Sequence, residues 1–347
     1  MKMKAKYLLI ATAATLLAAC SNDENVTDNG PVEARVTAGF GAVSRAVNTD
    51  DTWARNDEIG VMVTKVEQPG GSGTIPSGMV DRYKNVKYIT EQGGGTATFK
   101  AAEAGQGIFF QDATETVTFA AYYPYQTSTG ASTLPDAITV NTKENNTDAK
   151  QAKIDFLFAT GATASKSSPA VEFKDNSATP GGTNCQFLHK MAQLKLVIVG
   201  STADGFTEEE AKAVCAGAST YKLGGLIHEG TFTLAVSSGT ATGMAAATGT
   251  ADSDWDITGC VKKDEESAYK RTYTLVLLPQ DCSSSALTFQ ATIGGQTYTN
   301  STDITPNLEA GNTYTYTITA KKKGLEVSGC TIKAWTSNDD KSGDATM

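Results

Sequence analysis

The stretch VEARVTAGFGAVSRAV (residues 32–47) opens with apolar side chains at every second position. These apolar positions are Val32, Ala34, Val36, Ala38 and Phe40. A period of two predicts a β-strand with one buried face. The same stretch contains Arg45, a residue type at which trypsin-like proteases cut. The sequence therefore places a strand beside a candidate cleavage site, and the alternative interpretation is an ordinary first strand followed by an incidental arginine.

The residues before this strand form an export signal. Three lysines at positions 2, 4 and 6 precede the apolar run YLLIATAATLLAA (7–19), which is too short for a transmembrane helix. We interpret residues 1–19 as a signal peptide and exclude them from the fold. The end of this segment, LAAC (17–20), resembles the bacterial lipobox, which predicts a diacylglycerol on Cys20 that anchors the chain to a membrane. The alternative is an ordinary signal peptide that contains a cysteine.

The segment SNDENVTDNG (21–30) is acidic and turn-rich, as expected of a solvated tether. It also resembles the signal that directs some Bacteroidetes lipoproteins to the outer cell surface. The whole chain of 347 residues has a net charge of −9 and a pI of about 4.9. This charge argues against nucleic acid or an anionic membrane surface as a partner. The length allows two domains of ordinary size.

The remainder of the chain predicts an all-β fold. Short strand-like runs such as EIGVMVTK (58–65) and TVTFAAYYPY (116–125) are separated by Gly, Ser, Asn, Asp and Pro, which is typical of β-sandwiches. One helix is predicted in residues 206–217, with a capping box formed by Thr207 and Glu210. The low content of large apolar residues predicts a mobile loop at 237–254, and the segment 174–184 is the candidate domain junction.

The sequence contains little that indicates catalysis. The two histidines, His189 and His228, lie in apolar surroundings and are interpreted as structural, and no nucleophile or phosphate-binding motif is present. The acidic residues of DSDWDITG (252–259) have the spacing of the first calcium-loop ligands, but Lys263 stands where such a loop needs glutamate, so we favour a solvated turn. Five cysteines besides Cys20 show no metal-type spacing; most are expected to be buried thiols, with one or two disulfides as the alternative. We therefore expect no enzyme activity, no cofactor and no metal.

Physical reasoning gives the first strand a possible purpose. A buried strand pairs its backbone N–H and C=O groups with neighbours. If cleavage after Arg45 released residues 32–42, an apolar groove and unpaired strand edges would remain, and such edges recruit other strands.

Several segments, taken in order, resemble the fimbrillin family, the subunits of type V pili in Bacteroidales. SRAV (44–47) is followed by WARNDEIGVMV (53–63), which resembles the family's W-x-x-x-D-x-I-G-V start. The other segments are FAAYYPY (119–125), DFLFA (155–159), FLHKMAQLKLVI (187–198), LLPQ (277–280), LEAGNTYTYTIT (308–319) and GLEVSGCTIKAWTSND (324–339).

This resemblance implies an outer-membrane lipoprotein precursor with two tandem transthyretin-like β-sandwich domains. The implied parts are a signal peptide (1–19), a lipidated propeptide with the removable strand (20–45), an N-terminal sandwich (46–180), a C-terminal sandwich (181–323) and a C-terminal extension (324–347). In family members an arginine-specific protease removes the propeptide, and a strand from a neighbouring subunit fills the opened groove. The resemblance therefore implies cleavage after Arg45, with Ala46 as the new N-terminus.

The C-terminal extension supplies the donor strand in this family. Here it has apolar side chains suited to that role and no proline, which would interrupt strand pairing. The donor residues implied are Leu325, Val327, Ile332, Ala334 and Trp335. The polar end, residues 337–347, does not continue this pattern.

The resemblance thus implies a structural subunit of a fimbria, exposed on the cell outer membrane. Its expected partners are other copies of itself or related fimbrial subunits, and a membrane through the lipid on Cys20 before cleavage. Two alternatives stay open. One is a tip subunit or adhesin that binds a host or bacterial surface ligand. The other is an anchored surface lipoprotein that binds glycan, for which Trp255 is the one tryptophan expected in a loop.

Overall fold

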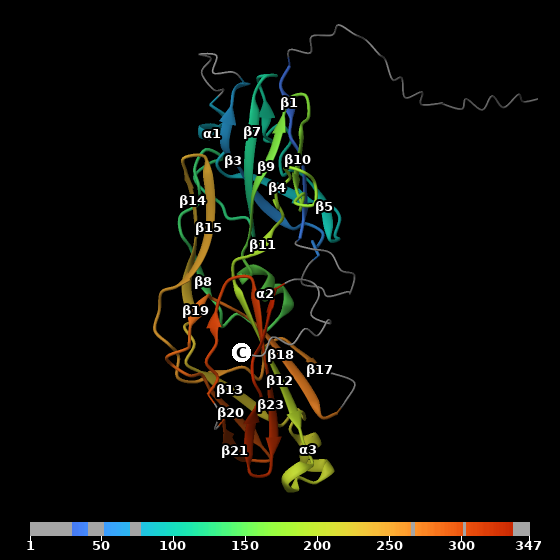
Figure 1. Ribbon diagram of the computed structural model, residues 1–347, viewed down its shortest axis with the longest axis vertical. Coiled ribbons are helices and arrows are strands. Elements are labelled where there is room, and N and C mark those ends of the chain that lie inside the picture. Colours follow the sequence, from blue (N-terminus) through green and yellow to red (C-terminus); the bar gives the residue numbers. More distant parts are fainter. Residues whose placement is uncertain (1–29, 41–51, 70–77, 265–267, 301–302, 336–347) are drawn as a thin grey trace, which may run out of the picture. The chain divides into compact units, whose positions relative to one another are not determined.

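The computed structural model describes residues 30–40, 52–69, 78–264, 268–300 and 303–335 (Figure 1). These residues form strands β1 to β25 and a few short helices, so the predicted all-β fold class is confirmed. The helices are α1 (Met79–Arg82), α2 (Asp148–Ile154), η3 (Ala203–Gly205) and α3 (Glu208–Ala213). Helix α3 begins with the predicted capping box, in which Thr207 and Glu210 satisfy each other's backbone N–H groups.

The first sheet has eight strands in the order β10-β2-β5-β4-β3-β7-β9-β11. Neighbouring strands are antiparallel except β2 and β10, which run parallel. Strand β10, at one end of this order, also contacts β9, near the other end, so the sheet curls around one core built from alternate side chains. The strands are β2 (Arg35–Gly39), β3 (Glu58–Glu67), β4 (Val86–Thr90), β5 (Thr96–Ala101), β7 (Thr116–Tyr123), β9 (Leu157–Ser165), β10 (Ala170–Phe173) and β11 (Leu188–His189). Before β2, β1 (Val32–Glu33) pairs with β6 (Phe109–Phe110).

The second core lies between two further sheets. One has the order β17-β18-β12-β23-β24, with β25 also paired to β23, and the other has the order β16-β13-β20-β21. Buried side chains from both sheets, such as Leu196 and Phe289, join one cluster, which makes this part a β-sandwich. The strands are β12 (Ala192–Gly200), β13 (Thr220–Gly224), β16 (Trp255–Asp256), β17 (Lys262–Asp264), β18 (Lys270–Leu277), β20 (Thr288–Ile293), β21 (Gln296–Thr299), β23 (Asn312–Lys321), β24 (Gly324–Val327) and β25 (Thr331–Ala334). A short pair, β19 (Gln280–Asp281) and β22 (Asn307–Leu308), lies outside these sheets.

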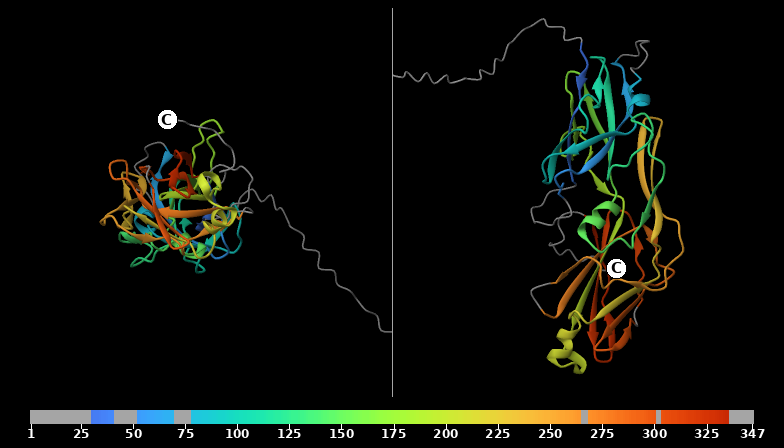
Figure 2. Two further views of the ribbon diagram at one scale, coloured as in Figure 1. Left: turned by 90° about the horizontal axis from the view of Figure 1, so that it is seen from below. Right: turned by 180° about the vertical axis from the view of Figure 1, so that it is seen from behind.

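A long hairpin corrects one expectation. The loop predicted at 237–254 is wrong for about half of its length, because β15 (Thr240–Ala247) pairs there with β14 (Glu229–Ser237). Strand β14 also pairs with β8 (Ile138–Asn141), and the hairpin lies along strands of the first sheet (Figures 1 and 2). The small residues of β15 permit this close packing: a Cβ added at Gly243 would lie 2.6 Å from a ring atom of Phe158.

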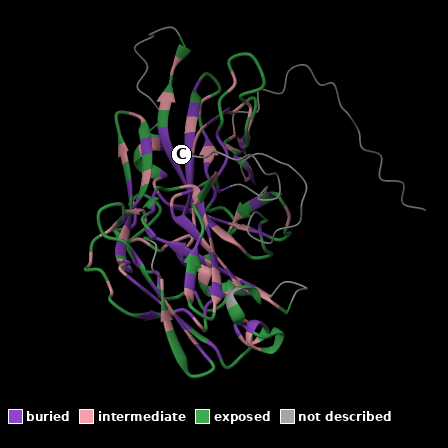
Figure 3. Cartoon of the chain, turned by 60° about the horizontal axis from the view of Figure 1, so that its bottom comes forward, coloured by how far each residue is buried: buried purple, intermediate pink, exposed green. Residues whose placement is uncertain are grey.

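Buried residues alternate with exposed ones along many of the strands (Figure 3). In sequence, the first core ends at Phe187 and the second begins at Ala192. A third cluster contains residues from both halves of the chain, including Tyr122 and Phe232. The domain bounds 46–180 and 181–323, and the transthyretin-like topology, stay predictions.

Candidate functional site

Strand β2, the candidate removable strand, lies inside the first sheet and not at its edge. Val36 stands opposite Val171 of β10 on one side and opposite Phe99 of β5 on the other. Ala34, Val36 and Ala38 are almost fully buried in the first core. The flanking residues Val32 and Phe40 are half-buried. The structure therefore places the inward face of this segment on the alternate positions that the sequence indicated.

Aromatic side chains hold the end of β2. The indole N–H of Trp53 donates a hydrogen bond of 2.9 Å to the carbonyl oxygen of Ala38. The Trp53 ring packs against Phe40 at 4.5 Å between centroids and against Phe187 at 5.1 Å. Phe187 also donates its backbone N–H to the carbonyl of Gly39 at 3.1 Å. Trp53, which the sequence marks only as the start of a family segment, thus anchors the candidate removable strand.

The predicted lipidation and cleavage positions, Cys20, Arg45 and Ala46, lie outside the described residues. Within the residues described, no helix is long and apolar enough to cross a membrane.

The C-terminal extension folds back along β23, at the edge of its sheet. Strand β24 pairs with residues 318–321 and strand β25 with residues 312–315. Between them the register shifts by one residue, since Val327 faces Ile318 whereas Ile332 faces Tyr314. The backbone N–H of Ser328 donates to the carbonyl of Thr317 at 2.9 Å within this interruption.

The register shift brings four of the five predicted donor residues to one face. Cross-strand partners lie on the same side of a sheet, so Leu325, Val327, Ile332 and Ala334 share the face of β23 that carries Ile318 and Ala320. Leu325 and Val327 are buried, but Ile332 is 46% exposed and Ala334 is also exposed. A groove of about 530 Å³ runs beside Ile332, and Tyr314 and Tyr316 line it. The tail therefore presents part of its apolar face to solvent.

Trp335, the fifth predicted donor residue, is placed on the opposite face. Its side chain is 7% exposed and stacks on the ring of His189, with centroids 3.9 Å apart and planes 4° apart. His189 is itself buried, and its Nδ1 lies 2.9 Å from Oδ1 of Asp155. Sequence reasoning identified His189 as structural but missed its contact with the tail, because the two residues are 146 positions apart in the chain.

His228 is buried in a different way. Its Nδ1 lies 2.9 Å from the hydroxyl of Thr142, and its ring meets Trp255 edge-on, with centroids 4.6 Å apart. Burial, together with the nearby Lys143, lowers the pKa of His228 to about 4, so the imidazole is neutral at pH 7. Both histidines are hydrogen-bonded structural residues, as the sequence predicted.

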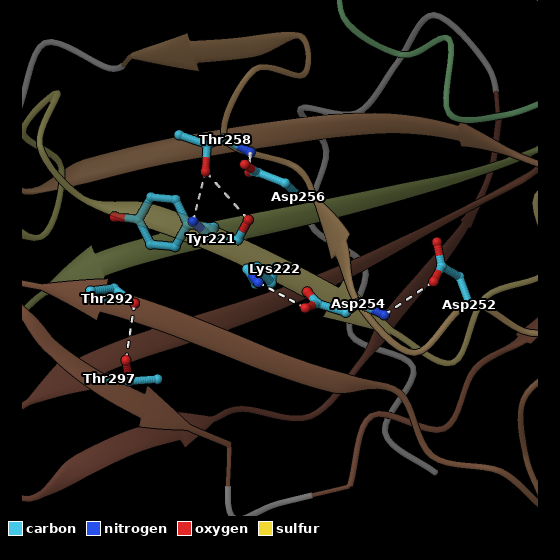
Figure 4. A network of polar contacts seen from close by, with 8 residues as sticks. All are labelled: Tyr221, Lys222, Asp252, Asp254, Asp256, Thr258, Thr292 and Thr297. Atoms are coloured by element: carbon cyan, nitrogen blue, oxygen red, sulfur yellow. Dashed lines mark hydrogen bonds and ion pairs between the residues drawn. The ribbon is translucent and has the colours of Figure 1, made fainter.

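The acidic stretch near residue 254 forms turns and ion pairs (Figure 4). Asp252 accepts a hydrogen bond from the backbone N–H of Asp254 at 3.2 Å, and the Asp254 carboxylate pairs with Lys222 at 2.7 Å. Asp256 accepts from the backbone N–H of Thr258 at 2.8 Å. Across the described ranges, no group of three or more His, Cys, Asp or Glu side chains is arranged to hold a metal ion.

The cysteines at 185, 215, 260, 282 and 330 are free thiols in the structure. Burial raises the pKa of Cys260 to about 12 and that of Cys282 to about 11. These two thiols therefore stay protonated at neutral pH, a form that is a poor nucleophile.

Comparison with known proteins gives a consistent result. A family model described as fimbrillin-like matches residues 44–335. The chain is 30% identical over 343 residues to "Putative fimbrium subunit Fim1C" of Bacteroides uniformis, and the match covers 96% of each chain.

Two solved structures share the fold. A "putative cell adhesion protein" from Bacteroides ovatus has 25% identity and a TM-score of 0.63, with 89% of this chain and 100% of that chain covered. Another from Bacteroides uniformis has 24% identity and a TM-score of 0.58, with 90% of this chain and 100% of that chain covered. Because the family model spans most of the chain and the curated relative matches nearly all of it, this chain belongs to the fimbrillin-like family.

Proposed function

We propose that this chain is a structural subunit of a cell-surface fimbria that reaches the outer membrane as a lipoprotein on Cys20. Cleavage after Arg45 then frees β2, and subunits polymerise when the tail of one copy replaces β2 in the next. The observation that carries the proposal is the position of β2. It is inserted between β5 and β10, it contributes buried side chains to the first core, and it precedes the candidate cleavage site.

Loss of β2 would have a specific physical cost. Four residues of β10 and four of β5 pair with it, and their ladder groups would lose these partners together. The positions of Ala34, Val36 and Ala38 would open as an apolar groove. A second strand that enters the groove restores both ladders and covers the core, which is strand addition at an exposed edge.

The C-terminal extension has the chemistry of such a strand. Its apolar side chains at Leu325, Val327, Ile332 and Ala334 lie on one face, and two of them are exposed before assembly. Burial of exposed apolar surface favours transfer into a groove. Residues 336–347 lie outside the described residues, so their part in the donor strand stays a prediction.

The structure weighs against the glycan-binding alternative. That alternative needs aromatic platforms on the surface, and Trp255 was its candidate. Trp255 instead lies in β16 and is 6% exposed, and the other two tryptophans, Trp53 and Trp335, are also buried. No feature of the described residues favours a tip or adhesin role over a shaft role.

The proposal is tested by the substitution Arg45→Ala in cells that produce the pilus. We expect a folded, membrane-bound monomer and no SDS-resistant ladder in unboiled samples, because β2 remains covalently attached. Arg55→Ala is the matched control, since Arg55 is exposed in a turn and should leave the ladder unchanged. A full ladder from Arg45→Ala would overturn the role assigned to cleavage.

A further inference from the structure

Strand β25 is held weakly along most of its length. Of residues 328–335, only Trp335 is buried, while Ser328, Gly329, Thr331, Ile332 and Ala334 are exposed. The strand pairs with β23 at the edge of its sheet. Edge ladders with few buried side chains open easily. The retention of β25 must therefore depend strongly on how Trp335 is fixed.

Trp335 is fixed by residues outside its own sheet. Its ring lies flat on His189 of β11, which pairs with β9 of the first sheet. Its backbone N–H donates to the carbonyl of Gly311 at 2.5 Å. Gly311 in turn donates its N–H to the carbonyl of Met191 at 2.8 Å. The end of the tail is thus tied to the chain segment that follows β11.

Asp155 sets the orientation of the His189 ring. Its Oδ1 lies 2.9 Å from Nδ1 of His189, and its backbone N–H caps helix α2 by donating to the carbonyl of Gln151 at 2.9 Å. The histidine backbone is fixed as well, because His189 stands opposite Leu157 in the β9–β11 ladder. The His189 ring is thus fixed through its contact with Asp155 and through its paired backbone. A fixed ring offers a preorganised flat surface, which lowers the entropic cost of stacking.

We infer that the triad Asp155–His189–Trp335 is a positioning device that keeps β25 docked in the unassembled subunit and limits the rate at which the tail is released. The docking itself is a property of the free chain. Its consequence for assembly rests on the proposed function, in which the released tail becomes the donor strand. His189 and Asp155 lie outside the tail, so changing them alters release without altering the donor sequence.

The chain offers an internal control for this inference. Trp255 is also buried and also contacts a buried histidine, His228, but it lies in β16, in a different sheet from the tail strands β24 and β25. Loss of this second Trp–His contact should affect stability without any preference for β25.

The first measurement is hydrogen exchange of the backbone amides of β25 and β12 in the full chain. His189→Ala should speed exchange in β25 by about tenfold, a factor expected for loss of one aromatic contact. Asp155→Ala keeps the ring but removes its hydrogen bond to Asp155, and it should speed exchange in β25 by a smaller factor. Exchange in β12 should stay unchanged. Trp335→Phe should retain more protection than Trp335→Leu, because a phenyl ring can still stack. His228→Ala is the control, and it should not speed exchange in β25 more than in β12.

Two results would overturn the inference. One is unchanged exchange in β25 after both His189→Ala and Trp335→Leu. The other is faster exchange that appears equally in β25 and β12, because that pattern indicates general destabilisation rather than release of the tail.

The second measurement is the rate of polymerisation of processed subunits. His189→Ala should polymerise faster than the wild type, whereas His228→Ala should not. If wild-type subunits form no polymer, the proposed function fails. The exchange measurement then still shows whether the triad keeps β25 docked. If the wild type polymerises and His189→Ala does so at the same rate, docking of β25 does not limit release.

Discussion

His228 shows how burial alone changes the chemistry of a residue. Its side chain is 3% exposed, its Nε2 has no hydrogen-bond partner among the described residues, and its pKa falls to about 4 from an ordinary value of 6.5. Protonation would place a charge in a site that can satisfy only one ring nitrogen, through Thr142. The charged form is therefore disfavoured in the folded chain.

This shift predicts a pH dependence of stability. Between pH 6.5 and 4 the unfolded chain binds a proton at His228 that the folded chain does not, so stability rises with pH in this window. As the pH falls from 6.5 to 4, the free energy of unfolding should decrease by up to about 3 kcal/mol because of this group. Urea unfolding of wild type and His228→Gln at pH 7, 5.5 and 4 checks it. If the free energy of unfolding changed with pH equally in the two proteins, His228 would not be the cause of the pH dependence.

For single residues, the sequence predicts the structural role of the two histidines but not the residues that they contact. Both histidines were predicted as structural because apolar residues surround them in the chain. Their different partners, Asp155 with Trp335 for one and Thr142 with Trp255 for the other, depend on elements far away in sequence. A local pattern carries no information on such contacts.

At the scale of elements, β2 differs from an ordinary terminal strand. Terminal strands are most easily lost when they lie at an edge, but β2 has a paired neighbour on each side. Ala34, just before β2, and Ala38, within it, are small, and Val36 between them is fully buried. The groove left by the loss of β2 would therefore be narrow at these positions. We expect this groove to bind strands with small or β-branched side chains at these positions in preference to others.

This selectivity can be measured with peptides. A synthetic peptide of residues 31–40, added in excess to the processed subunit, should raise its melting temperature by several degrees, because it binds only the folded chain. The same peptide with Val36→Asp should give no increase, since the carboxylate would be buried without a partner. Equal stabilisation by both peptides would show that the peptides do not bind in the groove left by β2.

For strands, a sequence pattern predicts which side chains are buried but not which strands pair. Alternation predicted the buried face of β2 because it is a local property of a strand. It could not predict that β5 and the parallel β10 flank it, since strand pairing is non-local. Strand β15 was missed because its core-facing positions carry Ala and Gly, which match a loop composition. Among them, Gly243 is required by the close approach of Phe158.

In the molecule as a whole, the proposed assembly brings together two segments that lie far apart in the sequence. The first is a strand buried inside the first sheet, and the second is an edge strand with an exposed apolar face. Membership of the fimbrillin-like family agrees with assembly into a fimbria. In the proposed assembly, the second segment of one copy takes the place of the first segment in another.

Cross-linking of mixed filaments can show whether this replacement takes place. Filaments grown from equal amounts of unlabelled and nitrogen-15-labelled subunits would be treated with a lysine-reactive reagent and analysed by mass spectrometry. The tail carries Lys333 in β25, and β5, next to the groove, carries the exposed Lys100. We expect links between Lys333 and Lys100 that join labelled to unlabelled copies, on subunits that begin at Ala46. Filaments in which Lys333 links only within its own copy, or whose subunits still carry residues 32–40, would contradict it.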